Sequence, residues 1–130
     1  MPSIFTRIIN GEIPCHKLAE DDQFIAFLDV RPQAKGHALV VPKVEVDYIF
    51  DQSDDVLSKM LVFARPVARA IEASVPCKRI GLAVVGLEVP HTHLHLIPMN
   101  QIQDLGFNHP VDMTQDELAE LAAAIREELA

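Results

Sequence analysis

Three histidines alternate with other residues in the segment HTHLHLIP, at positions 91, 93 and 95. They make up half of the six histidines in the chain. Side chains alternate between the two faces of an extended strand, so these three are expected to share one face while the intervening residues point to the other. The solvent-facing half of a strand usually carries Lys, Thr, Glu or Gln, so the repeated histidine favours a chemical role.

Two kinds of chemistry fit this pattern. Alternate histidines lie about 6.6 Å apart along a strand and can converge on one zinc ion, with His37 or Glu88 as a further ligand. Alternatively, a neutral imidazole can attack phosphorus through one ring nitrogen while a hydrogen bond orients the other nitrogen. The flanking histidines would then donate protons and hold the phosphate. The residues alone leave both hypotheses open.

The composition narrows the class of protein. The 19 acidic and 11 basic residues give a formal charge of −8, and no Lys/Arg cluster stands out, so we expect no nucleic-acid or membrane partner. At this length, residues 1–130 are expected to form a single domain. Neither a signal sequence nor a membrane-spanning run is visible, which predicts a cytoplasmic protein. Cys15 and Cys77 lie far apart, so no disulfide framework or zinc knuckle is expected.

The rest of the chain predicts an α+β fold. β-forming runs punctuated by Gly and Pro predict strands over 17–20, 23–30, 36–43, 79–86 and 91–99, mostly antiparallel because the connections are short. A short helix is predicted after Ser3, a long amphipathic helix from Ser53 to about Ala73, and a C-terminal helix after a capping box at Thr114. Pro66 predicts a kink or break in the long helix near Phe63. The irregular loop over 99–113 could border a site.

HTHLHLIP resembles the His-φ-His-φ-His-φ-φ signature of the histidine triad (HIT) family, where φ is apolar, with Thr92 as a departure. The segments SIFTRIINGEIP and AFLDVRPQAKGHALVVPK also occur in the family's order, so the resemblance covers roughly residues 3–98. The chain is most similar to the small Hint-type nucleotidyl hydrolases. That resemblance implies a HIT-like fold: about five antiparallel strands in a sheet, a long central helix and a C-terminal helix. It also implies a homodimer with one continuous sheet.

The resemblance also implies roles for single residues. His93 matches the nucleophile that attacks the α-phosphorus and forms a nucleotidyl-histidine intermediate, which water then releases as a nucleoside monophosphate. His95 matches the residue near the phosphate and the leaving group, His91 the first member of the triad, and His37 a fourth histidine in the proton network. Asp29 matches the acceptor for both ribose hydroxyls, a role that suits a carboxylate. The apolar wall around the purine is matched by Ile4, Phe5, Ile8, Phe27 and Val30.

The segment before the triad departs from the family pattern. VVGLEVPH lacks the usual Asn, glycines and Gln-Ser or Gln-Thr pair, and Glu88 falls near the Ser/Thr position. A carboxylate repels phosphate, so we expect phosphate binding to rely on backbone N–H groups near Val89. Some relatives bind a structural zinc through an N-terminal Cys-x-x-Cys. Ser3 and Thr6 occupy those positions here, so no such zinc and no cofactor are expected.

The leading hypothesis is therefore a nucleotidyl hydrolase or transferase that cleaves a purine nucleoside 5′-phosphoramidate or a related nucleotide ester. A Fhit-like dinucleoside polyphosphate hydrolase would use the same residues. A non-catalytic nucleotide-binding protein is the alternative from a different class, because the phosphate segment has lost its usual donors. A metal-dependent hydrolase is the third alternative.

Overall fold

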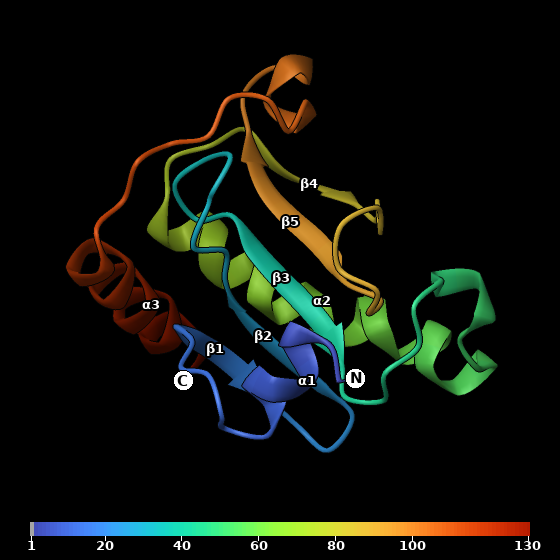
Figure 1. The fold of residues 1–130 in the computed structure, drawn as a ribbon. Helices are drawn as coiled ribbons and strands as arrows, with labels where there is room; N and C mark the ends of the chain where they lie inside the picture. Colours follow the sequence, from blue (N-terminus) through green and yellow to red (C-terminus); the bar gives the residue numbers. More distant parts are fainter. Residues whose placement is uncertain (1) are drawn as a thin grey trace.

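The computed structural model describes residues 2–130, whose five strands form one antiparallel sheet in the order β1-β2-β3-β5-β4 (Figure 1). The strands are β1 (Lys17–Glu20), β2 (Phe24–Leu28), β3 (Ala38–Pro42), β4 (Arg79–Ala83) and β5 (Leu94–Met99). The predicted α+β fold with a five-stranded antiparallel sheet is confirmed.

Three α-helices surround the sheet, and each begins at a side-chain cap. They are α1 (Ile4–Ile9), α2 (Asp54–Ser74) and α3 (Gln115–Leu129), with short 3₁₀ helices η1 (Ile49–Asp51) and η2 (Ile102–Leu105) in the connections. Ser3 and Ser53 accept backbone N–H bonds at the starts of α1 and α2, and Thr114 and Glu117 form a reciprocal capping box at α3. The three predicted helices are therefore present, with the predicted caps at Ser3 and Thr114 and a further cap at Ser53.

The long helix α2 does not break at Pro66. It runs without interruption over 21 residues, so the predicted break near Phe63 is absent, while the alternative, a kink, stays a prediction. The side chain of Pro66 is exposed, while Ala64 and Val67 on either side of it are buried. Burial of the apolar stripe along the whole helix therefore outweighs the missing backbone hydrogen bond.

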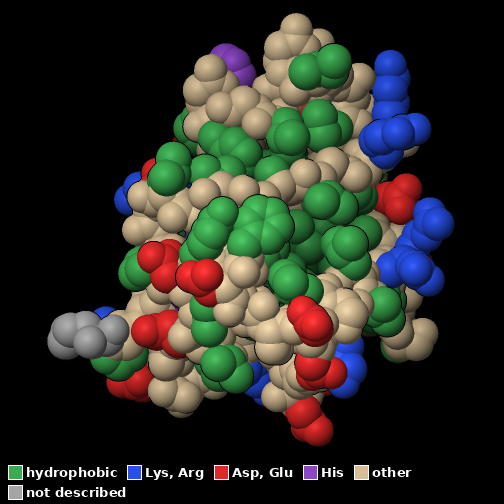
Figure 2. Space-filling model, turned by 90° about the vertical axis from the view of Figure 1, so that its right-hand side faces the viewer, with side chains coloured by type: hydrophobic (Ala, Val, Ile, Leu, Met, Phe, Trp, Pro, Cys, Tyr) green, Lys and Arg blue, Asp and Glu red, His purple; other side chains and the backbone are tan. Residues whose placement is uncertain are grey.

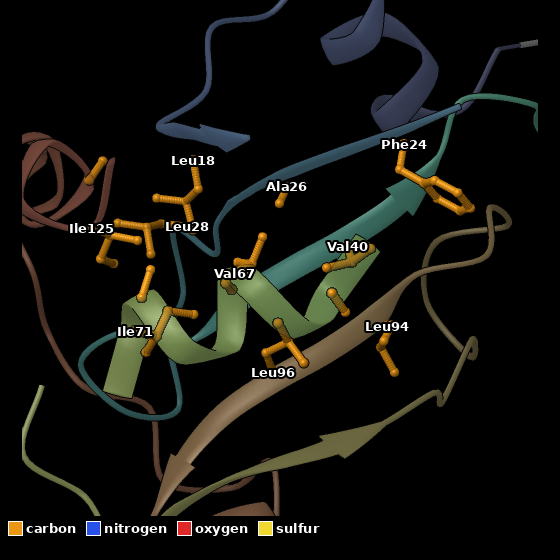
Figure 3. Close-up of a cluster of buried hydrophobic side chains, with 14 of the residues drawn as sticks. Leu18, Phe24, Ala26, Leu28, Val40, Val67, Ile71, Leu94, Leu96 and Ile125 are labelled. Carbon is orange, nitrogen blue, oxygen red and sulfur yellow. The ribbon is translucent and has the colours of Figure 1, made fainter. Parts of the chain in front are cut away.

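The sheet separates two apolar clusters. On one face, α2 and α3 pack on the side chains of the central strands, among them Val40, Leu94 and Leu96, to form the larger core (Figure 3). On the other face, Phe5 of α1 packs on Ile25, Phe27, Leu39 and Val41. Leu94 and Leu96 point to the helices, so the intervening residue of β5 points to the face that α1 covers.

The strand that carries the histidines is shorter than predicted. It begins at Leu94, because pairing between β3 and β5 ends at Val40 and Leu94. The N–H of Lys43 donates to Gln23 on the β2 side, so the neighbouring Pro42 faces the β5 side and offers no N–H there. His91, Thr92 and His93 instead form an irregular segment that backbone bonds to Val89 and Val46 hold in place.

None of the helices in residues 2–130 combines the length and the hydropathy that crossing a membrane requires.

Candidate active site

The sheet register brings His37 and His95 into contact although they lie 58 residues apart. His95 on β5 pairs with Leu39 on β3, and His37 stands two residues before Leu39 on the same face. It is thus the diagonal neighbour of His95. The two rings are joined by a hydrogen bond of 3.0 Å between His37 Nε2 and His95 Nδ1.

The direction of this bond follows from its other partners. The backbone N–H of Gln33 donates to His37 Nδ1 at 2.9 Å, so the proton of the neutral ring is on Nε2 and is donated to His95 Nδ1. The proton of His95 is then on its own Nε2. Burial lowers the pKa of each ring to about 4, helped by the charge of neighbouring histidines, so both rings are neutral at pH 7.

His93 has the opposite tautomer. Its Nδ1 lies 2.7 Å from the carbonyl oxygen of His91, which can only accept, so Nδ1 carries the proton and Nε2 keeps its lone pair. The His93 ring packs edge-on against Phe5 and His95, with centroid separations of 4.9 and 5.0 Å. A lone pair on His93 and an N–H on His95 therefore stand beside each other.

His91 has both ring nitrogens bonded to the protein. Its Nε2–H donates to the Pro42 carbonyl at 2.7 Å, and its Nδ1 accepts from the Ser3 hydroxyl at 2.7 Å. Burial lowers the pKa of this imidazole, which agrees with a neutral ring. With both nitrogens occupied, His91 supports its neighbours and offers no free nitrogen to a substrate.

Asp29 lies at the edge of this histidine cluster. Its Oδ2 is 3.6 Å from His37 Nε2, and its Oδ1 accepts the N–H of Arg31 at 2.8 Å. Burial raises the pKa of the carboxyl group, and the Arg31 N–H partly offsets this rise. The loop that leads to His37 closes through Gly36, whose φ of +96° favours glycine and where a Cβ would lie only 3.1 Å from Pro98.

The geometry of the histidine cluster suits a hydrogen-bonded network better than a metal site. Within residues 2–130, the histidine and carboxylate donors that lie within 4.8 Å of one another belong to Asp29, His37 and His95, not to the three alternate histidines. A metal on His37 would need a lone pair at Nε2. The Gln33 N–H occupies the lone pair at Nδ1 and so keeps the proton on Nε2.

The predicted apolar wall is only partly assembled. Phe5 and Phe27 meet edge-on at 5.7 Å in the cluster beside the histidines, and Ile8 and Val89 pack against that cluster. Ile4 and Val30 are 48% and 57% exposed and lie outside the buried cluster, where they present apolar surface. Glu88 is exposed as well. The binding role of each residue stays a prediction.

Two neighbours of the histidines were missed from the sequence. Phe107 stacks edge-on against His95 at 4.7 Å, and its φ of +59° is unusual for a bulky residue. Two hydrogen bonds anchor its loop. The Val111 N–H donates to the Pro32 carbonyl at 2.8 Å, and the His109 N–H donates to Gln33 Oε1 at 3.1 Å. The only sequence signal was the irregular loop over 99–113, and nothing distinguished Gln33.

A family model described as the HIT domain matches residues 10–102. The chain belongs to the HIT family. Over 112 residues, this HIT chain is 37% identical to the adenosine 5′-monophosphoramidase hnt1 of Schizosaccharomyces pombe, which covers 85% of the chain and 84% of the relative.

Solved HIT structures share the fold. A Hit-like protein from Bartonella henselae, described as involved in cell-cycle regulation, aligns with a TM-score of 0.84 at 29% identity, covering 97% of this chain and 95% of that one. A zinc-bound histidine triad family protein from Mycobacterium smegmatis aligns with a TM-score of 0.81 at 26% identity, covering 97% and 91%. The resemblance inferred from the three sequence motifs is thus confirmed at the level of the family and the fold.

Proposed function

We propose that this HIT protein is a nucleotide hydrolase or transferase that cleaves a purine nucleoside 5′-phosphoramidate or a related nucleotide ester through His93. The observation that carries the proposal is the tautomer of His93, whose Nδ1–H is bonded to the His91 carbonyl and whose Nε2 lone pair is therefore available. The yeast relative named adenosine 5′-monophosphoramidase supports the choice of substrate class.

In the first half of the proposed reaction, the Nε2 lone pair of His93 forms a bond to the α-phosphorus. The bond from phosphorus to the leaving nitrogen or oxygen breaks, and the leaving group takes the electron pair. The Nε2–H of His95, whose ring is 5.0 Å from His93 between centroids, donates a hydrogen bond to the leaving atom. The leaving amine takes up a proton from solvent at this position, so His95 keeps its own Nε2–H.

In the second half, water attacks the phosphorus and breaks the bond to His93. The nucleoside monophosphate leaves, and the proton that water loses replaces the one taken by the leaving amine. The His37 Nε2–H bond to His95 Nδ1 keeps His95 in one orientation and one tautomer through both halves. Both steps use residues of this chain alone.

The nucleoside is proposed to lie between Asp29 and α1. The half-buried carboxylate of Asp29 accepts hydrogen bonds from the ribose hydroxyls. The exposed side chains of Ile4 and Val30, next to Phe5, Ile8 and Phe27, contact the purine. Since Glu88 is exposed, its carboxylate can face solvent while backbone N–H groups near Val89 bind the phosphate.

We also propose a homodimer. The outer edge of β4 has no partner strand within residues 2–130, and unpaired edges bind further strands readily. Figure 2 shows hydrophobic side chains gathered over the centre of the face to which this edge belongs. The exposed large hydrophobic residues of the nearby segments are Val44, Tyr48, Phe50, Leu61, Val62, Leu82, Val85 and Leu87. Apolar surface of this extent is typical of an interface.

The test of the catalytic proposal is the release of AMP from adenosine 5′-phosphoramidate in the presence of EDTA. The wild type should release AMP, and His93→Ala should be slower by at least about a thousandfold because it lacks the nucleophile. His16→Ala is the matched control, because His16 lies outside the histidine cluster and bonds to Gln115. It should keep the wild-type rate.

Each other result has a distinct meaning. A fully active His93→Ala overturns the proposal. If the wild type cleaves only dinucleoside polyphosphates, the Fhit-like alternative is correct. Tight AMP binding without turnover of either substrate class indicates a nucleotide-binding protein. Activity that disappears with EDTA and returns with zinc indicates a metal-dependent hydrolase.

A further inference from the structure

A hydrogen-bond cluster joins the start of α1 to the first histidine of the triad. Ser3 and His91 lie 88 residues apart in the chain, are 6% and 0% exposed, and meet at 2.7 Å between Ser3 Oγ and His91 Nδ1. Glu45 Oε1 accepts the Ser3 N–H at 2.7 Å and the Thr6 hydroxyl at 2.6 Å. The catalytic scheme proposed above uses none of these hydrogen bonds.

The partners determine where each proton lies. The Pro42 carbonyl holds the proton of His91 on Nε2, so Nδ1 needs a donor. Thr6 Oγ1 is 3.4 Å from Nδ1, but its proton is donated to the Glu45 carboxylate, which can only accept. Ser3 Oγ accepts the Thr6 N–H at 3.1 Å and keeps its own proton for His91. Ser3 is therefore the donor to this ring.

This cluster acts on His93 through the backbone of His91. The His91 carbonyl accepts the Nδ1–H of His93, and the His91 N–H donates to the Val89 carbonyl at 2.8 Å. With its ring and its backbone both anchored, the His91 carbonyl has one orientation. In addition, the bonds from Glu45 hold the first turn of α1, whose Phe5 packs on the His93 ring at 4.9 Å.

We propose that Ser3 and Glu45 are positioning residues for His93: they hold His91 so that its carbonyl keeps His93 in the Nδ1–H tautomer with Nε2 free. The effect on turnover rests on the nucleophilic role proposed for His93. Neither residue contacts the proposed substrate. Their removal therefore lowers kcat by a larger factor than it raises KM.

The experiment compares Ser3→Gly with Ser3→Thr. Glycine is an acceptable N-cap, so Ser3→Gly removes the hydroxyl with little loss of helix stability, whereas Ser3→Thr keeps both the hydroxyl and the cap. We measure kcat and KM for AMP release, and the ring tautomer of His93 from long-range ¹H–¹⁵N NMR spectra. Ser3→Gly should lower kcat about tenfold, the effect of one lost hydrogen bond, and should populate the Nε2–H tautomer of His93. Ser3→Thr should preserve both quantities.

Two further variants complete the test. Ser53→Gly removes the equivalent cap hydroxyl from α2, outside the cluster, and should keep the wild-type kcat and tautomer. Glu45→Gln removes the charge from an exposed position and should lower kcat by a smaller factor, about threefold.

The proposal is overturned if Ser3→Gly keeps the wild-type His93 tautomer, or if Ser3→Gly and Ser53→Gly lower kcat equally. If the wild type proves to have no phosphoramidase activity, the proposed function fails while the tautomer still decides the positioning proposal. A shift toward Nε2–H in Ser3→Gly alone supports it, and an unchanged tautomer overturns it.

Discussion

His37 and His95 share a hydrogen bond whose direction is set by one backbone N–H, that of Gln33. A carbonyl sets the tautomer of His93 in the same manner, but with the opposite result. A partner that can only donate or only accept therefore fixes the tautomer of each ring. At the residue scale, two residues of the same type thus present different groups: His93 a lone pair and the neighbouring His95 an N–H, as the proposed reaction requires.

The low pKa values of His37 and His95 predict how stability depends on pH. Both pKa values are about 4 in the folded protein and about 6.5 in an unfolded chain. Between these values the unfolded chain binds more protons, so the free energy of unfolding falls as the pH falls from about 6.5 to about 4. The loss is about 1.4 kcal/mol per pH unit for each histidine, and above pH 6.5 these groups contribute no slope.

Urea denaturation at pH 7, 5.5 and 4.5 measures this slope. His37→Gln and His95→Gln should each reduce the decline in the free energy of unfolding between pH 6.5 and 4, because each removes one group that the unfolded chain protonates. A decline that is equally steep in both variants would contradict the burial of these neutral rings.

At the scale of elements, α2 shows packing overriding local preference. Pro66 removes one backbone donor from the middle of the helix, yet the helix continues, because the apolar stripe from Val56 to Ile71 is buried against the sheet and α3. The shortened β5 shows the converse, since its pairing with β3 ends before Pro42, which offers no N–H to β5. Proline therefore marks the end of the pairing between β3 and β5 but leaves the helix α2 intact.

Pro66→Ala should raise the free energy of unfolding by about 1–3 kcal/mol. The substitution restores the N–H that can donate to the carbonyl of Val62, four residues earlier, and the exposed proline side chain contributes little packing. Chemical denaturation measures the change. Arg65→Ala, at the neighbouring exposed position, should stay within about 0.5 kcal/mol of the wild type. A destabilised Pro66→Ala would show instead that the backbone of α2 is adapted to proline.

At the scale of the whole molecule, the sheet has the larger apolar core on one face and the histidine cluster on the other. The helices α2 and α3 cover the face with the larger core, and α1 lies on the other face (Figure 1). The histidines are on the side of α1, where Phe5 contacts His93 and Phe107 contacts His95. Within residues 2–130, the outer edge of β4 has no partner strand. A second copy that pairs with this edge would extend the sheet without covering the face that carries the histidines.

Leu82→Lys tests the proposed dimer. Leu82 lies on the edge strand and is 54% exposed, so a lysine there is tolerated in the monomer and places a charge in the interface. Analytical ultracentrifugation should show a dimer for the wild type and a monomer for Leu82→Lys. Ala123→Lys, which adds the same charge to an exposed position on α3, should remain dimeric. A monomeric wild type at tens of micromolar would refute the dimer.

The sequence by itself was sufficient for the family, the five strands, the three helices and the caps of α1 and α3. These features depend on local spacing: alternate histidines and Leu94/Leu96 on opposite faces, apolar stripes at helical periods, and polar caps at helix starts. It also singled out the four histidines and Asp29, because His37 and Asp29 lie within motifs of the family. The loop over 99–113 was visible only as an irregular segment.

Only the tertiary structure decided the first residue of β5, the continuity of α2, the approach of Phe107 to His95, the bond of Ser3 to His91 and the bonds of Glu45 to Ser3 and Thr6. It also decided the protonation of each ring. The start of β5 and the bonds of Ser3 and Glu45 depend on partners 40 or more residues away in the chain, and the continuity of α2 depends on burial outweighing a missing hydrogen bond. The tautomers of His93 and His37 depend on how the folded loops orient backbone groups two and four residues away. None of these is encoded in the spacing of neighbouring residues, because hydrogen-bond direction and burial exist only once distant segments are packed together.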